Sequence, residues 1–113
     1  LMGYAWSIKG ERGEEIRQMI REGRKVLKPL RESVREKRKS QRDLLKAEPF
    51  DRSAVQAAMA EMADARQKLN ESRRAIFLDS LEKMSAEERQ GFLKWRHRHF
   101  KRWRRWGRRH REE

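Results

Sequence analysis

The feature that most constrains this chain is Pro49, which lies between two long charged segments whose apolar residues recur at helical spacing. The proline disfavours helical geometry at Glu48, so a helix that precedes it must end there. Asp51 can then cap a second helix by accepting a hydrogen bond from a free backbone N–H in its first turn. Phe50, just before this cap, can pack against Val55 as a hydrophobic staple. The chain is therefore predicted to fold back on itself as an antiparallel helical hairpin.

The segment before this turn predicts a helix of about nine turns that starts near Glu14. Its apolar positions lie at spacings typical of one helix face: Ile16, Met19, Ile20, Val26, Leu27, Leu30, Val34, Leu44 and Leu45. Pro29 lies inside the helix and removes one backbone hydrogen bond, so a kink or a break is expected there. Gly23 is expected to loosen the same region.

A second helix is predicted to begin at Arg52. The residues that it presents to the first helix are Val55, Ala58, Met59, Met62, Ala65, Leu69, Ile76 and Phe77. Its two methionines are expected to fill an irregular seam rather than to bind a ligand. Leu78 and Leu81 point away from this stripe, so the C-terminal end of the helix needs another partner, either a third helix or a second subunit.

A capping box predicts the start of a third helix. Ser85 stands at the N-cap and Glu88 follows three residues later, so each side chain can accept a hydrogen bond from the backbone N–H of the other. The expected stripe of this helix is Phe92, Trp95, His99, Trp103 and Trp106, and every charged side chain from residue 92 to residue 111 is Lys or Arg. The basic-aromatic surface is predicted to comprise Trp95, Arg96, Arg98, Lys101, Arg102, Trp103, Arg104, Arg105 and Trp106.

The composition limits how these helices can pack. With 113 residues, 35% hydrophobic and 43% charged, the chain has enough apolar surface for a narrow seam and not for a thick core. We therefore predict an all-α fold: a long antiparallel helical hairpin plus a third helix, hooked, with dimeric four-helix-type packing. The predicted organisation is a flexible lead-in at residues 1–13, a helical domain at 14–94 and a basic C-terminal tail at 95–113.

Several functional classes find no support in the sequence. Cysteine is absent, so there is no disulfide, no thiolate zinc site and no thiol nucleophile. No motif resembles a phosphate-binding glycine loop, a nucleophile elbow or a pair of catalytic carboxylates, and the chain is predicted not to be an enzyme. No apolar run reaches the length needed to span a bilayer. Because the chain opens with Leu1 rather than Met, an upstream leader or membrane anchor is one expectation.

The only imidazoles are His97, His99 and His110, and they are the candidate ligands for a divalent Zn, Ni, Co or Cu ion. On a helix, residues i and i+2 point about 200° apart, so the first two cannot chelate one ion unless the tail unwinds. The surrounding cations also oppose the binding of a divalent ion. The preferred interpretation is that these histidines are polar members of a basic tail, and metal binding is the alternative.

The net charge of +13 favours an anionic partner, and most of the excess lies in the tail. An Arg/Trp helix of this kind can pack on the body of a dimer, lie on an anionic membrane surface, or bind single-stranded nucleic acid. We rank protein packing, or a frayed end, first, the membrane surface second and nucleic acid third.

Two short motifs stand about one helix apart. They are Leu45-Lys46-Ala47-Glu48-Pro49-Phe50-Asp51 and Met84-Ser85-Ala86-Glu87-Glu88-Arg89. Together they resemble the two turns of the bacterial periplasmic heavy-metal-resistance family, which is related to the stress chaperones CpxP and Spy, the zinc-associated ZraP and the nickel/cobalt sensor CnrX. The resemblance covers roughly residues 14–94 and leaves the lead-in and the tail outside.

The resemblance implies a helical homodimer in the periplasm, held at the inner membrane by a segment outside this chain or exported by a signal peptide. It also implies a role in binding proteins or metal ions, as sensor, regulator or chaperone, with an envelope client or a membrane-bound regulator as partner. The metal-sensing members carry His and Met one turn apart before the second turn, where this chain has Ile76 and Ser80. The sensor's site is therefore predicted to be missing.

Overall fold

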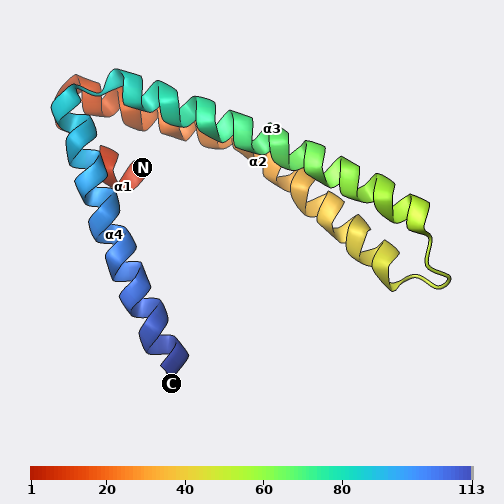
Figure 1. Ribbon diagram of the computed structural model, residues 1–113. Coiled ribbons are helices and arrows are strands. Elements are labelled where there is room, and N and C mark those ends of the chain that lie inside the picture. Colours follow the sequence, from red (N-terminus) through yellow and green to blue (C-terminus); the bar gives the residue numbers. More distant parts are fainter. Residues whose placement is uncertain (113) are drawn as a thin grey trace. The chain divides into compact units, whose positions relative to one another are not determined.

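The computed structural model describes the backbone of residues 1–112 and the side chains of residues 1–105 and 107. Over this part of the chain there are four helices and no strand: α1 (Met2–Ala5), α2 (Gly10–Lys46), α3 (Arg52–Lys83) and α4 (Ala86–Glu112) (Figure 1). The all-α fold with a long helical hairpin and a further long helix is confirmed. The homodimer stays a prediction. Trp106 and His110, two of the predicted site residues, lie outside the described side chains.

The turn at Pro49 forms as the sequence predicts. Helix α2 ends at Lys46, and α3 begins at Arg52 with Asp51 as its cap. The backbone N–H of Ala54 donates to Asp51 Oδ1 at 3.1 Å, which satisfies one of the free donors of the first turn. Phe50 remains 58% exposed, so the predicted staple covers only part of its ring. The reversal therefore depends on the proline and the aspartate more than on apolar contact.

The chain packs as two compact units. The hairpin unit comprises residues 19–78, and the terminal unit comprises residues 1–18 and 79–113. Helices α2 and α3 contribute to both, because each begins or ends beyond the limits of the hairpin unit. The predicted domain boundaries near residues 13 and 94 stay predictions.

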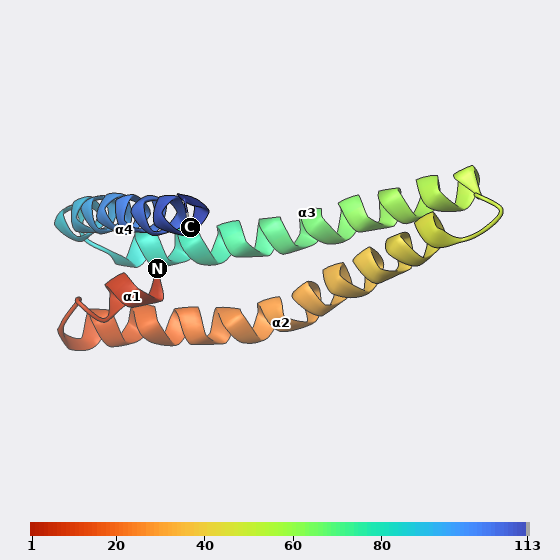
Figure 2. The ribbon, with the colours of Figure 1, turned by 90° about the horizontal axis from the view of Figure 1, so that it is seen from below.

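A single apolar seam holds the hairpin unit together, and its two helices run antiparallel (Figure 2). On α3 the buried positions alternate at steps of three and four residues, which is the spacing of a coiled-coil face: Val55, Ala58, Met62, Ala65 and Leu69. The last three pack with Leu27 and Val34 of α2 in one cluster, which Leu30 and Ile76 border. The narrow seam predicted from composition is therefore confirmed.

Three residues assigned to the seam from their spacing lie outside it. Val26, Leu45 and Met59 are each more than half exposed. Val26 and Met59 are direct neighbours of buried residues, and one step along a helix turns a side chain by about 100°, which carries it off a face this narrow. Leu45 belongs to the last turn of α2, beyond the buried cluster.

Helix α2 continues through Pro29 without a break. Its ribbon changes direction near the middle of the helix, so the alternative of a kink is the one observed (Figure 2). Pro29 and Lys25 are both exposed, so water can hydrate the Lys25 carbonyl that the proline leaves without a donor. The helix is also continuous at Gly23, where a Cβ would lie 2.8 Å from Ile76 Cδ1, so glycine allows α2 to approach α3 closely.

The first thirteen residues differ from the predicted flexible lead-in. Residues 2–5 form α1, and α2 begins at Gly10, four residues earlier than expected. Gly10 has φ = +84°, a left-handed conformation that glycine adopts without steric cost. Ala5 and Ile8 are buried, and the Arg17 guanidinium donates 3.1 Å hydrogen bonds to both of their carbonyls. These long-range contacts, which sequence spacing does not reveal, order the segment.

We predict that Leu69→Ala destabilises the hairpin by about 2–5 kcal/mol, because Leu69 is 6% exposed at the centre of the seam and its truncation leaves a cavity. Leu78→Ala is the matched control on the same helix, since Leu78 is 55% exposed and its truncation is expected to change stability by less than about 0.5 kcal/mol. Urea unfolding followed by circular dichroism measures both. Equal losses for the two variants would contradict the single-seam packing.

Candidate functional site

Helix α4 carries the predicted basic-aromatic surface, and its start is fixed by the predicted capping box. The backbone N–H of Ser85 donates to Glu88 Oε1 at 2.8 Å, and the backbone N–H of Glu88 donates to Ser85 Oγ at 3.1 Å. Arg89 Nη1 donates to the carbonyl of Met84 at 2.9 Å, near the end of α3, where the last carbonyls of a helix lack partners. Residues of one short motif therefore provide hydrogen-bond partners for backbone groups at the end of α3 and at the start of α4.

Glu88 connects the capping box to the N-terminal segment. Its carboxylate lies 3.0 Å from Arg12 Nε, and its backbone carbonyl accepts a 2.6 Å hydrogen bond from the Tyr4 hydroxyl. The hydrogen bond from Ser85 N–H holds the pKa of Glu88 below its ordinary value, and the Ser85 hydroxyl and the Arg12 charge act in the same direction against burial. Burial raises the pKa of Tyr4, with a smaller contribution from the Glu88 charge, so the phenol stays a donor at neutral pH.

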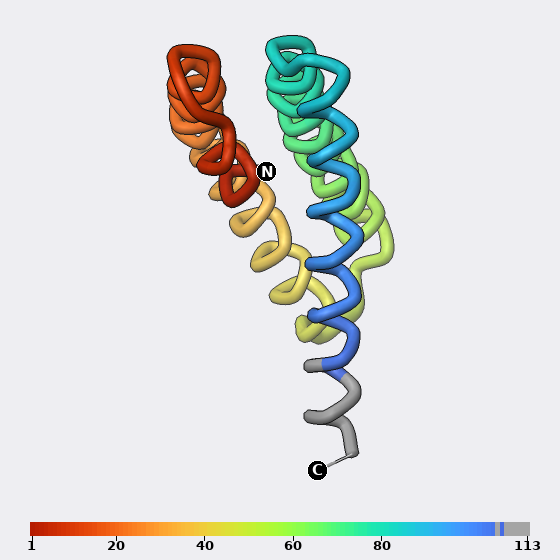
Figure 3. The backbone as a smooth tube through the Cα atoms, turned by 90° about the vertical axis from the view of Figure 1, so that its left-hand side faces the viewer, coloured from red at the N-terminus to blue at the C-terminus, as the bar shows by residue number. Residues whose placement is uncertain are grey.

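Aromatic side chains of α1 and α4, two segments far apart in sequence whose backbone paths Figure 3 traces, form a cluster. The Tyr4 ring lies 5.6 Å from that of Phe92 and 6.2 Å from that of Trp95, and Phe92 is buried. His99 continues the cluster, with its ring stacked on Trp95 at 4.2 Å. A Cβ at Gly3 would lie 3.0 Å from the Trp95 ring, so glycine lets α1 lie this close. The predicted stripe therefore packs against α1 through Phe92 and Trp95, while His99 is exposed and stacks on Trp95 of its own helix.

Other apolar side chains of α4 are exposed to solvent. Leu93 is 61% exposed, Phe100 52% and Trp103 69%. Trp103 was predicted to continue the stripe of Phe92 and Trp95, but its side chain is not buried in the described chain. The Arg104 guanidinium lies 4.8 Å above the centre of the Phe100 ring, a cation–π contact that keeps a charge beside the apolar group. The predicted cations around these side chains are all exposed: Arg96, Arg98, Lys101, Arg102, Arg104 and Arg105.

The structure does not bring the described histidines together as metal ligands. His97 and His99 are two residues apart on a continuous helix, where they point about 200° from each other, and His99 stacks on Trp95. Within the described residues no group of three or more His, Cys, Asp or Glu side chains is arranged to hold a metal ion. Metal binding by the tail histidines stays a prediction.

Ile76 and Ser80, the residues expected to replace the sensor's metal donors, are both part of the packed structure. Ile76 borders the buried cluster and packs over Gly23, and Ser80 is completely buried. The sequence analysis missed Tyr4 and Arg12 as partners of Glu88, because these contacts join residues up to 84 apart in sequence. It also missed Arg17 as the partner of the Ala5 and Ile8 carbonyls. The one local signal was an N-terminal segment unusually rich in aromatic residues for this chain, with Tyr4 and Trp6.

Comparison with known proteins gives one match. A family model described as heavy-metal resistance matches residues 7–91 of the 113. No curated protein and no solved structure matches the chain significantly. None of the described helices is long and apolar enough to cross a membrane. The matched segment ends at Gly91, so almost all of the basic part of α4 lies beyond it.

We predict that acid weakens the terminal unit through Glu88. Because the folded-state pKa of Glu88 lies below its ordinary value of 4.5, its contribution to stability is complete above that value and is lost as the pH falls through the folded-state pKa. Glu88→Gln should lower stability at pH 7 by about 1 kcal/mol and flatten the acid limb of the pH profile. Thermal unfolding from about pH 7 to 3 measures this.

The neighbouring Glu87→Gln variant is the control, because Glu87 is exposed in the same first turn and lies outside the capping box. If Glu87→Gln and Glu88→Gln show the same pH profile, the effect belongs to the general charge at the helix N-terminus and not to the Glu88 contacts.

Proposed function

We propose, from the premise that this chain belongs to the heavy-metal-resistance family, that it captures acidic protein segments on α4 as part of a metal or envelope stress response. The family is generally extracytoplasmic and is not enzymatic. The expected partners are an unfolded envelope protein or the extracytoplasmic part of a membrane-bound regulator. The protein would therefore act as a chaperone-like binder or a regulator in the periplasm.

The observation that carries the proposal is the row of exposed apolar side chains on α4. Leu93, Phe100 and Trp103 lie seven and three residues apart, so they share one side of the helix. Burying one side chain of this size against a partner contributes roughly 1.5–3 kcal/mol, part of which is offset by the loss of freedom on association. Such a surface favours reversible capture over permanent assembly.

The surrounding charge selects the partner. No acidic side chain occurs between residues 92 and 111, and every charged side chain in this stretch is Lys or Arg. Oppositely charged surfaces speed encounter and disfavour basic partners. An acidic segment with apolar residues at helical spacing is therefore the chemistry that fits this surface best.

The alternatives from the sequence stay open as proposals of lower rank. A zinc-, nickel- or copper-binding sensor would need His97, His99 and His110 to converge, and the His99 stack on Trp95 would have to be broken first. A nucleic-acid partner would use the same cations and the exposed Trp103 as a stacking platform. An anionic membrane would accept the same amphipathic helix.

We predict that the full chain binds a labelled synthetic helix of Glu and Leu with micromolar affinity, and that a matched Lys/Leu helix does not bind. Fluorescence anisotropy should show a dissociation constant that rises about tenfold or more between about 20 and 300 mM salt, since screening shortens the range of the attraction. An affinity indifferent to salt would reject the electrostatic part of the proposal.

Phe100→Ala should weaken this binding by about 1.5–3 kcal/mol, because it removes a large apolar contact from the centre of the row. Leu78→Ala removes an equally exposed side chain from α3 and should leave the affinity unchanged. Equal losses for the two variants would place the contact elsewhere. Tighter binding of a single-stranded oligonucleotide than of the Glu/Leu helix would instead favour the nucleic-acid alternative.

A further inference from the structure

Arginine side chains from both helices of the hairpin unit surround a cavity of about 340 Å³. The cavity is lined by α2 and α3 alone, and it shares no residue with the α4 surface. We refer to its five arginines as the arginine cluster: Arg31, Arg35, Arg38, Arg66 and Arg73. Val34, Leu69 and Asn70 complete the lining.

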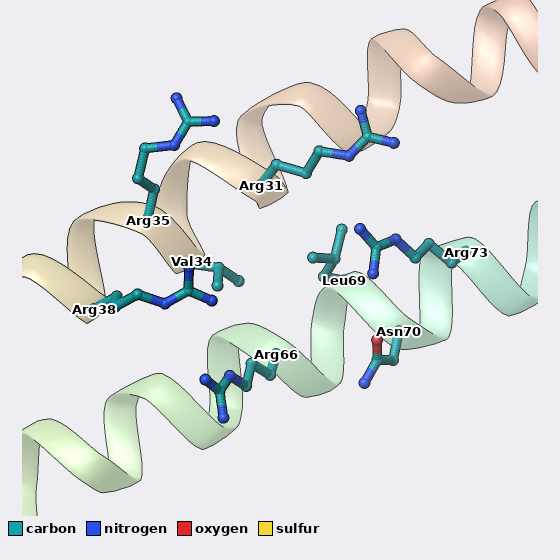
Figure 4. A pocket seen from close by; sticks show the side chains of 8 residues that line it. All are labelled: Arg31, Val34, Arg35, Arg38, Arg66, Leu69, Asn70 and Arg73. Carbon is teal, nitrogen blue, oxygen red and sulfur yellow. The ribbon is translucent and has the colours of Figure 1, made fainter. Parts of the chain in front are cut away.

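Helical spacing explains why these residues meet. Arg31, Arg35 and Arg38 lie at i, i+4 and i+7 along one side of α2, and Arg66 and Arg73 lie seven residues apart on α3. Both rows border the seam, because Val34 and Leu69 belong to its buried cluster. In the view of Figure 4 these two side chains lie between the helices, with the guanidinium groups of Arg38 and Arg73 beside them, while that of Arg35 is directed away from α3.

The arginine cluster has no acidic counterpart. No Asp or Glu lines the cavity, and none of the described acidic side chains forms an ion pair with its five guanidinium groups. Nearby carboxylates pair with lysines instead: Glu61 lies 3.3 Å from Lys37, and Asp64 lies 3.2 Å from Lys68. Five like charges at one cavity repel each other, so an anion placed among them is attracted by all five at once.

The chemical nature of the cationic groups limits the class of ligand that the cavity can bind. All five groups are guanidinium, whose planar fork matches pairs of phosphate oxygens, whereas an ammonium acts as a point charge. A single phosphate ion can engage only some of them. A cavity of about 340 Å³ has room for several linked tetrahedral groups.

We propose that the arginine cluster binds a ligand with several phosphate groups close together, with an inorganic oligophosphate as its simplest form. Val34 and Leu69, nearly buried beneath the guanidinium groups, give the cavity an apolar floor that keeps the helix spacing fixed while the charges are neutralised. Binding would remove the repulsion between α2 and α3 and so stabilise the hairpin unit. The site is independent of the protein capture assigned to α4.

Isothermal titration of the full chain with inorganic triphosphate at about 150 mM salt tests the proposal, because screening at this concentration suppresses diffuse attraction. The wild type should bind triphosphate with a dissociation constant at least about tenfold lower than that for orthophosphate. Absence of triphosphate binding, or equal affinity for the two ions, would overturn the proposal.

The double variant Arg38→Gln/Arg73→Gln should weaken triphosphate binding about tenfold or more. The control is Arg42→Gln/Arg74→Gln, which removes the same charge from exposed positions of the same two helices outside the cavity, and it should change the affinity less than about twofold. Equal weakening by both double variants would show a diffuse charge effect and reject the site. Circular dichroism of each variant separates lost affinity from lost folding.

Arg38→Lys/Arg73→Lys keeps the charge and removes the fork, so it should bind at an intermediate level; full retention would reject recognition by the guanidinium geometry. Vesicle flotation distinguishes two sources of clustered phosphate. If the Gln variant also loses association with cardiolipin vesicles, and triphosphate competes, the phosphates come from a lipid headgroup. If only triphosphate binding changes, the ligand is soluble.

Discussion

One apolar seam must hold α2 against α3, because the chain has few other side chains to bury. The alternation of three and four residues on α3 concentrates the apolar positions on a single face, and Gly23 lets the helices approach where Ile76 packs. The remaining faces of the hairpin unit are mostly polar, with single apolar side chains such as Val26 and Met59 exposed on them. The arginine cluster follows directly, since rows that border so thin a seam lie at the surface and are free to carry charge.

The terminal unit is stabilised in a different way, by polar contacts that converge on a few groups. Glu88 takes part in the α4 cap, pairs with the Arg12 side chain and accepts a hydrogen bond from the Tyr4 hydroxyl. Arg17 donates hydrogen bonds to two backbone carbonyls of the N-terminal segment. The Arg17 guanidinium also lies 4.8 Å from the Trp6 ring, while its Nε has no hydrogen-bond partner. Aromatic contacts along α4 reach His99, and Phe100 and Trp103 beyond it are exposed.

Local signals predicted the boundaries of this fold well. The helix caps at Asp51 and at Ser85 with Glu88 involve residues no more than four apart. Their hydrogen bonds could therefore be predicted from sequence alone, and they are observed. Spacing predicted burial less reliably. Val26 and Met59 each stand next to a buried residue in the sequence but are exposed, because the packing of the partner helix decides which of two neighbouring side chains is covered. The histidines could be excluded as a convergent pair from helix geometry, whereas the arginine cluster could not be found in this way, because it requires the register between two helices.

The sequence by itself determined the two turns at Pro49 and Ser85, that the seam between the long helices would be thin, and that the tail of the chain would be basic. These properties depend on backbone capping, proline sterics and composition, which act locally or on the chain as a whole. The tertiary structure alone decided that residues 1–13 are ordered, that Gly23 serves close packing, and that arginines 31–38 meet those at 66 and 73. The reason is that each of these results depends on which distant residue supplies the contact, and spacing along one chain segment carries no information about its partner.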